Sequence, residues 1–286
     1  MEIQRISLRG RLVTFNDPYR TNTVLILTED QVVVCDTFCG PDSMKKIRSY
    51  LEAEKQSEKQ FVIFNSHYHY DHIWGNCEFK EESIYAHTKC YELIAKYGKR
   101  NLEQYSEHMK GNVTLTYPNQ LFSSSAILDN GRIRLFHSPG HTLDSSSCID
   151  YEDRILFVGD NIESPIPYIY NPDLDLYIAT LMDYLSMDWK FLISGHDPLM
   201  TDATLIHSNI EYLEGLRDWS IDLKGLDDQT KSAHLMNLMV LVENLNEDDV
   251  DENVISRVQE ALSYLKASEL TEITRKYISI LEKIEQ

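Results

Sequence analysis

The sequence predicts an α/β domain followed by a helical region, and three observations lead to this fold class. From residue 5 to about 200, short strand-like runs alternate with segments of helical periodicity. From about residue 201 onward, every long segment has helical periodicity instead. The 286 residues, 42% of them hydrophobic, are enough for one large domain with a smaller appendage. We therefore divide the chain into a main domain, residues 1–204, and an acidic C-terminal helical extension, residues 205–286.

The first predicted elements are a hairpin and a helix. Residues 22–38, NTVLILTEDQVVVCDTF, contain two β-rich runs joined by TED, which is typical of a hairpin. Residues 40–56 have helical periodicity, with Pro41 near the start and Asp42 or Ser43 as the N-cap residue.

Strands and helices continue to alternate in the rest of the main domain. The apolar run in QFVIFNSH predicts a buried strand, and Asn130-Gly131 predicts the turn of a hairpin. Together the patterns predict strands or hairpins at 60–67, 83–87, 126–142, 147–160 and 189–197, and helices at 89–98 and 173–187. Several of these strands end in histidine or aspartate, and strand ends are where a rigid sheet best presents reactive groups.

The C-terminal extension is predicted to be a set of amphipathic helices. We expect their apolar faces to pack on the main domain or on a second copy of the chain, which would make a homo-oligomer. The helical segments are residues 202–223, 229–245, 253–266 and 268–286. The acidic run NEDDVDE at 246–252 separates the second from the third, and we interpret it as a solvated loop.

Charge and composition exclude several classes of partner and site. The formal net charge of −19 disfavours nucleic acid and anionic membranes, which both attract Lys and Arg. No apolar run approaches the roughly 20 residues that span a bilayer, and the first ten residues do not resemble a secretory signal. The five cysteines are scattered, so we expect small buried side chains in a reduced, cytoplasmic protein rather than disulfides.

The segment NSHYHYDHIWGN, residues 65–76, brings three histidines and an aspartate together directly after an apolar run. In an extended chain, His67 and His69 point to the same side and can approach one centre. Asp71 and His72 follow as the chain turns, and can reach a second centre beside the first. Imidazole nitrogen and carboxylate oxygen both ligate zinc, so these residues begin a metal site without completing it.

Three further residues can complete the metal site. His141 in SPGHT, Asp160 in FVGD and His196 in SGHD each follow a strand-like run and have small residues beside them. One arrangement satisfies the ligand count of two metals. In it the first metal has His67, His69 and His141, the second has Asp71, His72 and His196, and Asp160 bridges the two.

The motifs HYHYDH, SPGHT, GD and SGH, in this order, resemble those of the metallo-β-lactamase-fold hydrolase superfamily. The resemblance covers about residues 5 to 215 and leaves out the helical extension. It implies an αββα sandwich, with two mixed sheets face to face, helices outside, and a dimetal site at one sheet edge. It also implies two zinc ions per chain, with iron or manganese as alternatives.

Departures from the lactamase pattern favour the glyoxalase II and lactonase branch of this superfamily. His72 stands where one group of true β-lactamases has Arg, and Asp160 stands where they have Cys. Another lactamase group shares HxHxDH but lacks the bridging Asp. His69 stands where flavodiiron oxidoreductases have Glu, which argues against that class. The acidic extension makes an anionic glutathione thioester doubtful as the substrate, because glyoxalase II offers basic residues to it.

We therefore expect a dinuclear zinc hydrolase that cleaves a small-molecule ester, thioester or lactone with a metal-bridging hydroxide. Two cations lower the pKa of a shared water from about 15.7 towards about 7. Asp71 is the expected catalytic residue, which ligates one metal and orients the nucleophile or relays its proton. One alternative is a mononuclear iron oxidoreductase of the persulfide dioxygenase type. Another is a non-catalytic protein that is stapled by metal and binds a partner.

The remaining polar and aromatic residues receive simpler interpretations. Tyr168 and Tyr170, in the Pro-rich stretch SPIPYIYNP after Asp160, are candidates to contact substrate, although core packing explains them equally well. Asp36 is expected to support a ligand or a turn rather than to ligate. Five histidines are assigned structural roles: His87, His108, His137, His207 and His234.

Overall fold

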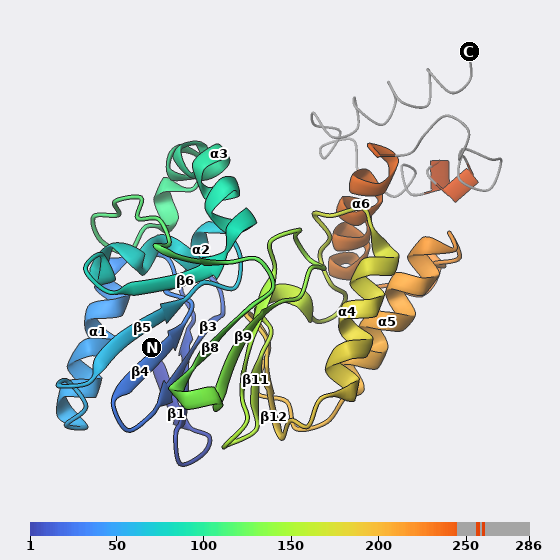
Figure 1. Ribbon diagram of the computed structural model, residues 1–286. Coiled ribbons are helices and arrows are strands. Elements are labelled where there is room, and N and C mark those ends of the chain that lie inside the picture. Colours follow the sequence, from blue (N-terminus) through green and yellow to red (C-terminus); the bar gives the residue numbers. More distant parts are fainter. Residues whose placement is uncertain (245–255, 258, 261–286) are drawn as a thin grey trace.

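Two mixed β-sheets lie face to face in the computed structural model, with helices on both outer sides (Figure 1). The structure describes residues 1–244, 256–257 and 259–260. The seven-stranded sheet follows chain order: β1 (Glu2–Arg5), β2 (Gly10–Phe15), β3 (Thr21–Leu27), β4 (Gln31–Cys35), β5 (Gln60–Phe64), β6 (Ser83–His87) and β7 (Gln120–Phe122). The five-stranded sheet has the order β12 (Phe191–Ile193), β11 (Ile155–Phe157), β10 (Ser146–Asp150), β9 (Ile133–His137) and β8 (Ser125–Leu128). The predicted αββα sandwich is confirmed.

Each sheet changes from antiparallel to parallel pairing where helices enter the connections. Strands β1 to β4 pair as antiparallel neighbours, and β4 to β7 pair in parallel. The second sheet is antiparallel from β8 to β11 and parallel between β11 and β12. The parallel pairs follow from the helices, because a strand can rejoin its neighbour in parallel only through a crossover.

The apolar runs of the central strands are continuous because both faces of the first sheet are buried. In β4, Val33 packs into the core between the sheets, whereas Val32 and Val34 pack under the outer helices. The same alternation places Val62 and Phe64 of β5 between the sheets. A strand that is covered on both sides is apolar on both faces, which explains its continuous apolar run. The prediction of a buried strand at β5 is confirmed.

The helices divide between the two outer sides. The first sheet is covered by α1 (Pro41–Ala53) and α3 (Thr88–Gln104), and the short α2 (Tyr70–Ile73) lies near its edge. The second sheet is covered by α4 (Leu174–Ser186) and α5 (Thr204–Arg217), and α6 (Asp228–Val242) lies beside these two helices at one end. Residues of β11, α4, α5 and α6 share one hydrophobic cluster, so the described part of the extension packs on the main domain.

Some sequence predictions need correction or stay open. The N-cap of α1 is Gly40 and not Asp42 or Ser43, because the helix already begins at Pro41. Strands β1, β2 and β7 are additional to the predicted ones. Of the helix predicted at 253–266, the structure describes residues 256, 257, 259 and 260, which are helical as expected. The loop predicted at 246–252 and the helix predicted at 268–286 lie outside the described residues. The division at residue 204 and association through these helices remain predictions.

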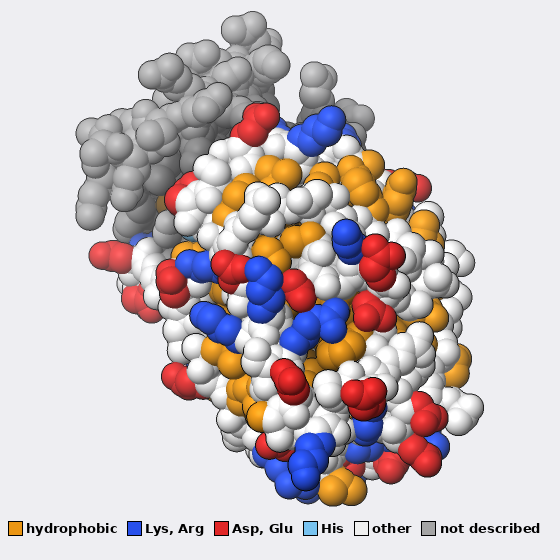
Figure 2. Space-filling model, turned by 90° about the vertical axis from the view of Figure 1, so that its left-hand side faces the viewer, with side chains coloured by type: hydrophobic (Ala, Val, Ile, Leu, Met, Phe, Trp, Pro, Cys, Tyr) orange, Lys and Arg blue, Asp and Glu red, His pale blue; other side chains and the backbone are white. Residues whose placement is uncertain are grey.

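Charges are mixed on the face of the molecule that Figure 2 presents. Lys and Arg side chains are interspersed with Asp and Glu there, and hydrophobic side chains form small groups between them. None of the described helices combines the length and the apolar composition that crossing a bilayer requires.

Acid is expected to destabilise the packing of α5 against α6 through His234. This side chain is 4% exposed, and burial lowers the pKa of His234 to about 4. Asn237 donates to the Tyr212 hydroxyl, whose own proton can then go to His234 Nδ1 at 3.0 Å, and this arrangement favours Nδ1 as an acceptor. Protonation therefore disrupts the contact as well as burying a charge.

We expect the free energy of unfolding to fall as the pH decreases from about 6.5 to 4, by up to about 3 kcal/mol for this residue. The unfolded chain binds the proton more readily in this window, so stability is lost as the pH falls. His234→Gln should flatten this part of the stability curve in denaturant titrations. The exposed His207→Gln serves as control, and equal pH dependence in all three proteins would contradict the assignment.

Candidate metal centre

The seven predicted ligands come together at the carboxyl ends of four strands. Residues 67–72 follow β5, His141 lies in the loop after β9, Asp160 follows β11 and His196 follows β12. The two sheets therefore contribute from opposite sides, and residues far apart in the chain meet at one edge of the sandwich (Figure 1).

Two glycines allow the strand ends to approach this closely. Gly159 has a φ of +54°, and a Cβ atom there would lie 2.7 Å from the side chain of Ser66. A Cβ atom on Gly195 would lie 2.0 Å from Asp160 Oδ1 and 2.9 Å from His72 Cε1. Any larger residue at position 195 would therefore displace the carboxylate at the centre of the cluster.

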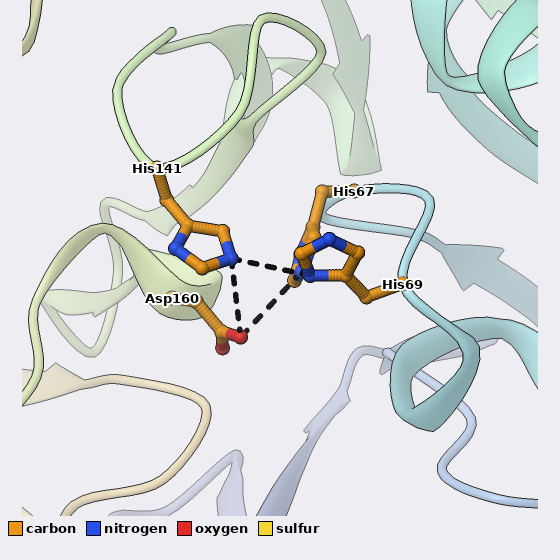
Figure 3. Close-up of side chains that lie close together, drawn as sticks. All are labelled: His67, His69, His141 and Asp160. Atoms are coloured by element: carbon orange, nitrogen blue, oxygen red, sulfur yellow. Dashed lines mark hydrogen bonds and ion pairs between the residues drawn. The ribbon is translucent and has the colours of Figure 1, made fainter. Parts of the chain in front are cut away.

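The first group of donors consists of His67, His69, His141 and Asp160 (Figure 3). His67 Nε2 lies 2.9 Å from His69 Nδ1, and His141 Nε2 lies 3.2 Å from the same atom. Asp160 Oδ2 is 3.5 Å from His67 Nε2 and 3.8 Å from His141 Nε2. The three rings and the carboxylate thus turn their donor atoms toward one point.

The second group consists of Asp71, His72 and His196, and it shares Asp160 with the first. Asp71 Oδ2 is 3.4 Å from His72 Nε2 and 3.5 Å from His196 Nε2. Asp160 Oδ2 is 3.2 Å from each of these two nitrogens. A single carboxylate oxygen therefore faces ring nitrogens of both groups, as the predicted bridging role requires.

The donor atoms suit divalent metals in their chemical type, in their spacing and in their lack of other hydrogen-bond partners. Zinc bound at 2.0–2.1 Å places neighbouring tetrahedral ligands roughly 3.3 Å apart, and the separations above scatter around this value. His72 Nε2 and Asp160 Oδ1 are buried atoms without a hydrogen-bond partner. Buried polar atoms are rarely left in this state, so bound cations account for the arrangement better than a polar core does.

The second nitrogen of each of four ligand rings is held by an oxygen. His67 Nδ1 lies 3.0 Å from Ser66 Oγ. His141 Nδ1 and His196 Nδ1 lie 2.8 Å and 2.6 Å from the backbone oxygens of Tyr168 and Arg20, respectively. Such contacts place the proton on Nδ1 and leave Nε2 free for a metal.

Asp36 holds the fourth ring, that of His72. Its Oδ2 lies 2.6 Å from His72 Nδ1 and accepts a hydrogen bond from the Ser66 hydroxyl, and its Oδ1 accepts one from the Ser66 backbone. Asp36 is fully buried and does not belong to either donor group, which agrees with the supporting role expected for it.

The electrostatics separate the histidines into two sets. Burial holds the pKa of His67 and His141 below the usual range and lowers the pKa of His69 to about 3. Burial opposes the charging of His196 too, yet Asp160 and Asp71 raise the pKa of His196 to about 10. Metal binding at the second group must therefore displace a proton, and its affinity should weaken in acid.

Replacing Asp36 with asparagine is expected to weaken metal binding by about 10–100-fold, because it removes the negative charge that orients His72. Competition with a chromogenic zinc chelator measures the change. The thermal unfolding of the metal-free variant should be recorded as well, because Asp36 is buried. Metal affinity equal to that of the wild type would exclude the supporting role.

Comparison with known proteins bears on this arrangement. Residues 16–218 match the family model described as the metallo-beta-lactamase superfamily, and this match spans most of the described chain. The chain belongs to the metallo-β-lactamase superfamily. The matched segment contains all seven donors and excludes α6.

Several curated relatives in this superfamily share part of the sequence. The hydroxyacylglutathione hydrolase of Pelagibacter ubique is 26% identical over 140 residues, which cover 49% of this chain and 50% of the relative. The 2,4-dinitroanisole O-demethylase subunit alpha of a Nocardioides species is 24% identical, covering 66% of this chain and 56% of the relative. The chain spans about half the length of the curated relatives it matches.

Solved metallo-β-lactamases share the fold. The DIM-1 metallo-β-lactamase exposed to ceftazidime superimposes with a TM-score of 0.60 at 17% identity, covering 74% of this chain and 96% of the enzyme. The metallo-β-lactamase from Pontibacter korlensis superimposes with a TM-score of 0.60 at 18% identity, covering 74% of this chain and 98% of that protein. At this level of identity, the likeness concerns the fold alone.

Both tyrosines that were predicted to contact substrate line a pocket beside the metal donors. Tyr170 is 50% exposed, and its ring centroid lies 4.7 Å from that of His69 and 5.0 Å from that of His141. Tyr168 lies on the same loop and holds His141 through its backbone oxygen.

Sequence reasoning missed one acidic residue of the pocket, Glu163. It is 8% exposed, burial and Asp160 raise the pKa of Glu163 to about 8, and one of its oxygens accepts from the Tyr168 backbone. Asn209 of α5 holds its backbone on both sides. No motif marked Glu163, because its place depends on a helix 46 positions away.

Four of the five histidines that were assigned structural roles have such contacts. His87 and His137 stack on each other with ring centroids 3.8 Å apart, and His234 contacts Tyr212. His108 Nδ1 lies 2.7 Å from the Tyr70 hydroxyl.

Proposed function

We propose that this protein is a metal-dependent hydrolase of an ester, thioester or lactone, with a dinuclear zinc site. The observation that carries the proposal is the pair of donor groups that share Asp160 Oδ2. Membership of the metallo-β-lactamase superfamily supports hydrolysis, and the relative named hydroxyacylglutathione hydrolase supports an acyl substrate.

His67, His69 and His141 would hold one metal, Asp71, His72 and His196 the other, and Asp160 would contact both. When bound, two such cations lower the pKa of a water to about 7 and polarise a carbonyl oxygen. The chain itself provides three aids to the reaction, and each comes from a different set of residues.

The first aid is the orientation of the attacking water by Asp71. Burial opposes ionisation of this carboxyl, but His72 and His196 lower the pKa of Asp71 to about 2. Its carboxylate therefore accepts hydrogen bonds at neutral pH, and it lines the pocket in which substrate must lie.

The second aid is rigidity, since Ser66, Asp36 and two backbone oxygens hold the imidazole rings.

The third aid is recognition by the loop that follows Asp160. Tyr168 and Tyr170 lie in the pocket wall, where they can contact the substrate and exclude water from the reacting carbonyl. The hydroxyl groups also supply hydrogen-bond donors, which a developing oxyanion requires.

The alternatives differ in what they require of the second donor group. A mononuclear iron oxidoreductase needs His67, His69 and His141 alone, and a metal staple for a binding protein needs no accessible pocket. The complete second group and the pocket beside it both favour the hydrolase.

Metal analysis together with a substrate panel tests the proposal. We expect two zinc ions per chain in the purified protein, and a loss of metal with loss of activity in His72→Ala. The exposed His207→Ala should behave as the wild type. Chromogenic esters, thioesters and lactones should be hydrolysed, with phosphodiesters and β-lactams as comparison. One iron per chain that is insensitive to His72→Ala would support the oxidoreductase instead.

A further inference from the structure

The pocket beside the metal donors has an unusual lining. Its volume is about 780 Å³, which is in the range that accepts a drug-sized molecule. Seven of its nineteen lining residues are tyrosines, although the whole chain has 17 tyrosines among 286 residues. Among the described lining residues, only Met236 has an aliphatic side chain without a polar end group.

Tyr170 forms part of the pocket wall beside the metal donors. Its ring meets those of His69 and His141 at interplanar angles of 70°, so it packs edge to face against two ligands. Its backbone is fixed by a hydrogen bond from Tyr170 N to His141 O of 2.8 Å. Half of the residue remains exposed, and its ring is therefore free to contact a substrate next to the reacting carbonyl.

Further tyrosines on the other segments are held in place by one another. The rings of Tyr70 and Tyr105 stack with centroids 4.5 Å apart. The Tyr70 hydroxyl lies 2.6 Å from that of Tyr19. Tyr68 packs against Tyr97 of α3 with centroids 5.7 Å apart. Because these rings are ordered before a substrate arrives, little conformational entropy is lost when one binds.

The lining is unsuited to two other acyl classes. A pocket for a fatty acyl chain needs aliphatic side chains, and Met236 alone has this character here. A polyanionic substrate needs several cations, and Arg20 and Arg100 are the only Lys or Arg side chains among the described lining residues. Aromatic rings, by contrast, gain offset or edge-to-face contacts with tyrosine in addition to burial.

We propose that the substrate carries an aromatic ring system on the acyl side of the bond that is cleaved, and that this ring packs against Tyr170. The proposal rests on the function proposed above. In the reaction, the oxygen of water bonds to the acyl carbon while the bond from that carbon to oxygen or sulfur breaks. The leaving alcohol or thiol takes one proton of the water, and the aromatic acid releases the other.

Matched thioesters of N-acetylcysteamine test the inference on the zinc-loaded protein. Phenylacetyl and cyclohexylacetyl thioesters have similar size, apolar area and chemical reactivity, and they differ in the aromatic ring. We expect kcat/KM to be at least about tenfold higher for the phenylacetyl compound, because several aromatic contacts are available to it. The corresponding 4-nitrophenyl esters provide a second pair.

Variants of one position assign the preference to Tyr170. Tyr170→Leu should reduce the phenylacetyl-to-cyclohexylacetyl ratio to below about threefold, whereas Tyr170→Phe should retain it. Tyr151→Leu is a matched control, because Tyr151 is 49% exposed, close to the 50% of Tyr170, and lies outside the pocket. Circular dichroism checks the folding of each variant, and the wild-type ratio decides the question even where a variant does not fold.

Binding of the product acids separates this inference from the proposed function. Phenylacetate should bind more tightly than cyclohexylacetate in equilibrium dialysis. Aromatic preference in binding without hydrolysis of any ester or thioester would remove the proposed function, and with it the acyl role of the ring, but would leave a pocket that binds aromatic rings. Hydrolysis of both members of each pair at equal rates would overturn the inference and leave the function standing.

Discussion

Asp160→Asn is expected to lose at least one bound metal and to reduce hydrolysis by more than about 100-fold. Replacing a residue that merely supports a metal ligand costs about 10–100-fold in affinity or activity, and Asp160 faces both donor groups directly. Its Oδ2 lies within 3.8 Å of four imidazole nitrogens. The amide removes the negative charge that two neighbouring cations would share, so their repulsion increases.

Zinc content after dialysis and kcat on the preferred ester measure this effect. Asp183→Asn is a suitable control, because Asp183 is an exposed residue of α4 outside the pocket. It should retain metal and activity. An Asp160→Asn protein with full zinc content and wild-type kcat would show that the carboxylate does not bridge the groups.

Gly195→Ala is expected to reduce metal binding and hydrolysis about as much as Asp160→Asn does, through a steric clash and without any change of charge. The added methyl group would lie 2.0 Å from Asp160 Oδ1, a separation that real Cβ contacts do not reach. Gly195 has little freedom to shift, because its N–H donates to Gly159 O and its carbonyl accepts from Asn22 N, both at 2.7 Å. The carboxylate must therefore move, and a displacement of about 1 Å can cost about 100-fold in rate.

Gly225→Ala separates this steric effect from the general cost of replacing a glycine. A Cβ atom on Gly225 would meet nothing within 4 Å. This variant should therefore bind zinc and hydrolyse substrate like the wild type. If Gly195→Ala also retained zinc and activity, the close packing of the β12 end against Asp160 would not be needed for function.

Most of the strands and the cluster of candidate metal donors could be predicted because their signals are local. The buried run of β5 ends directly at His67, and the hairpin of β8 and β9 has its turn at Asn130-Gly131. His141, Asp160 and His196 also stand beside small residues after strand-like runs. The predicted N-cap of α1 was wrong, because the actual N-cap residue, Gly40, makes no side-chain capping hydrogen bond.

Other parts of the site depend on contacts between distant segments. Asp36 reaches His72 across 36 positions, and Glu163 depends on Asn209 across 46. The pocket requires Tyr19, Tyr97 and Tyr170 to converge from separate loops and from α3. Periodicity in a single sequence carries no information about such distances, so only the three-dimensional structure places these residues.

The buried Asn237 connects α6 of the helical extension with the loop in the pocket wall. Its amide donates to Pro167 O and accepts from Ile169 N, so two hydrogen bonds hold the loop that bears Tyr168 and Tyr170. Neither α6 nor this loop contains any of the seven predicted metal donors. Laboratory evolution confined to α6 and this loop could retune which compounds are accepted while the metal ligands stay untouched.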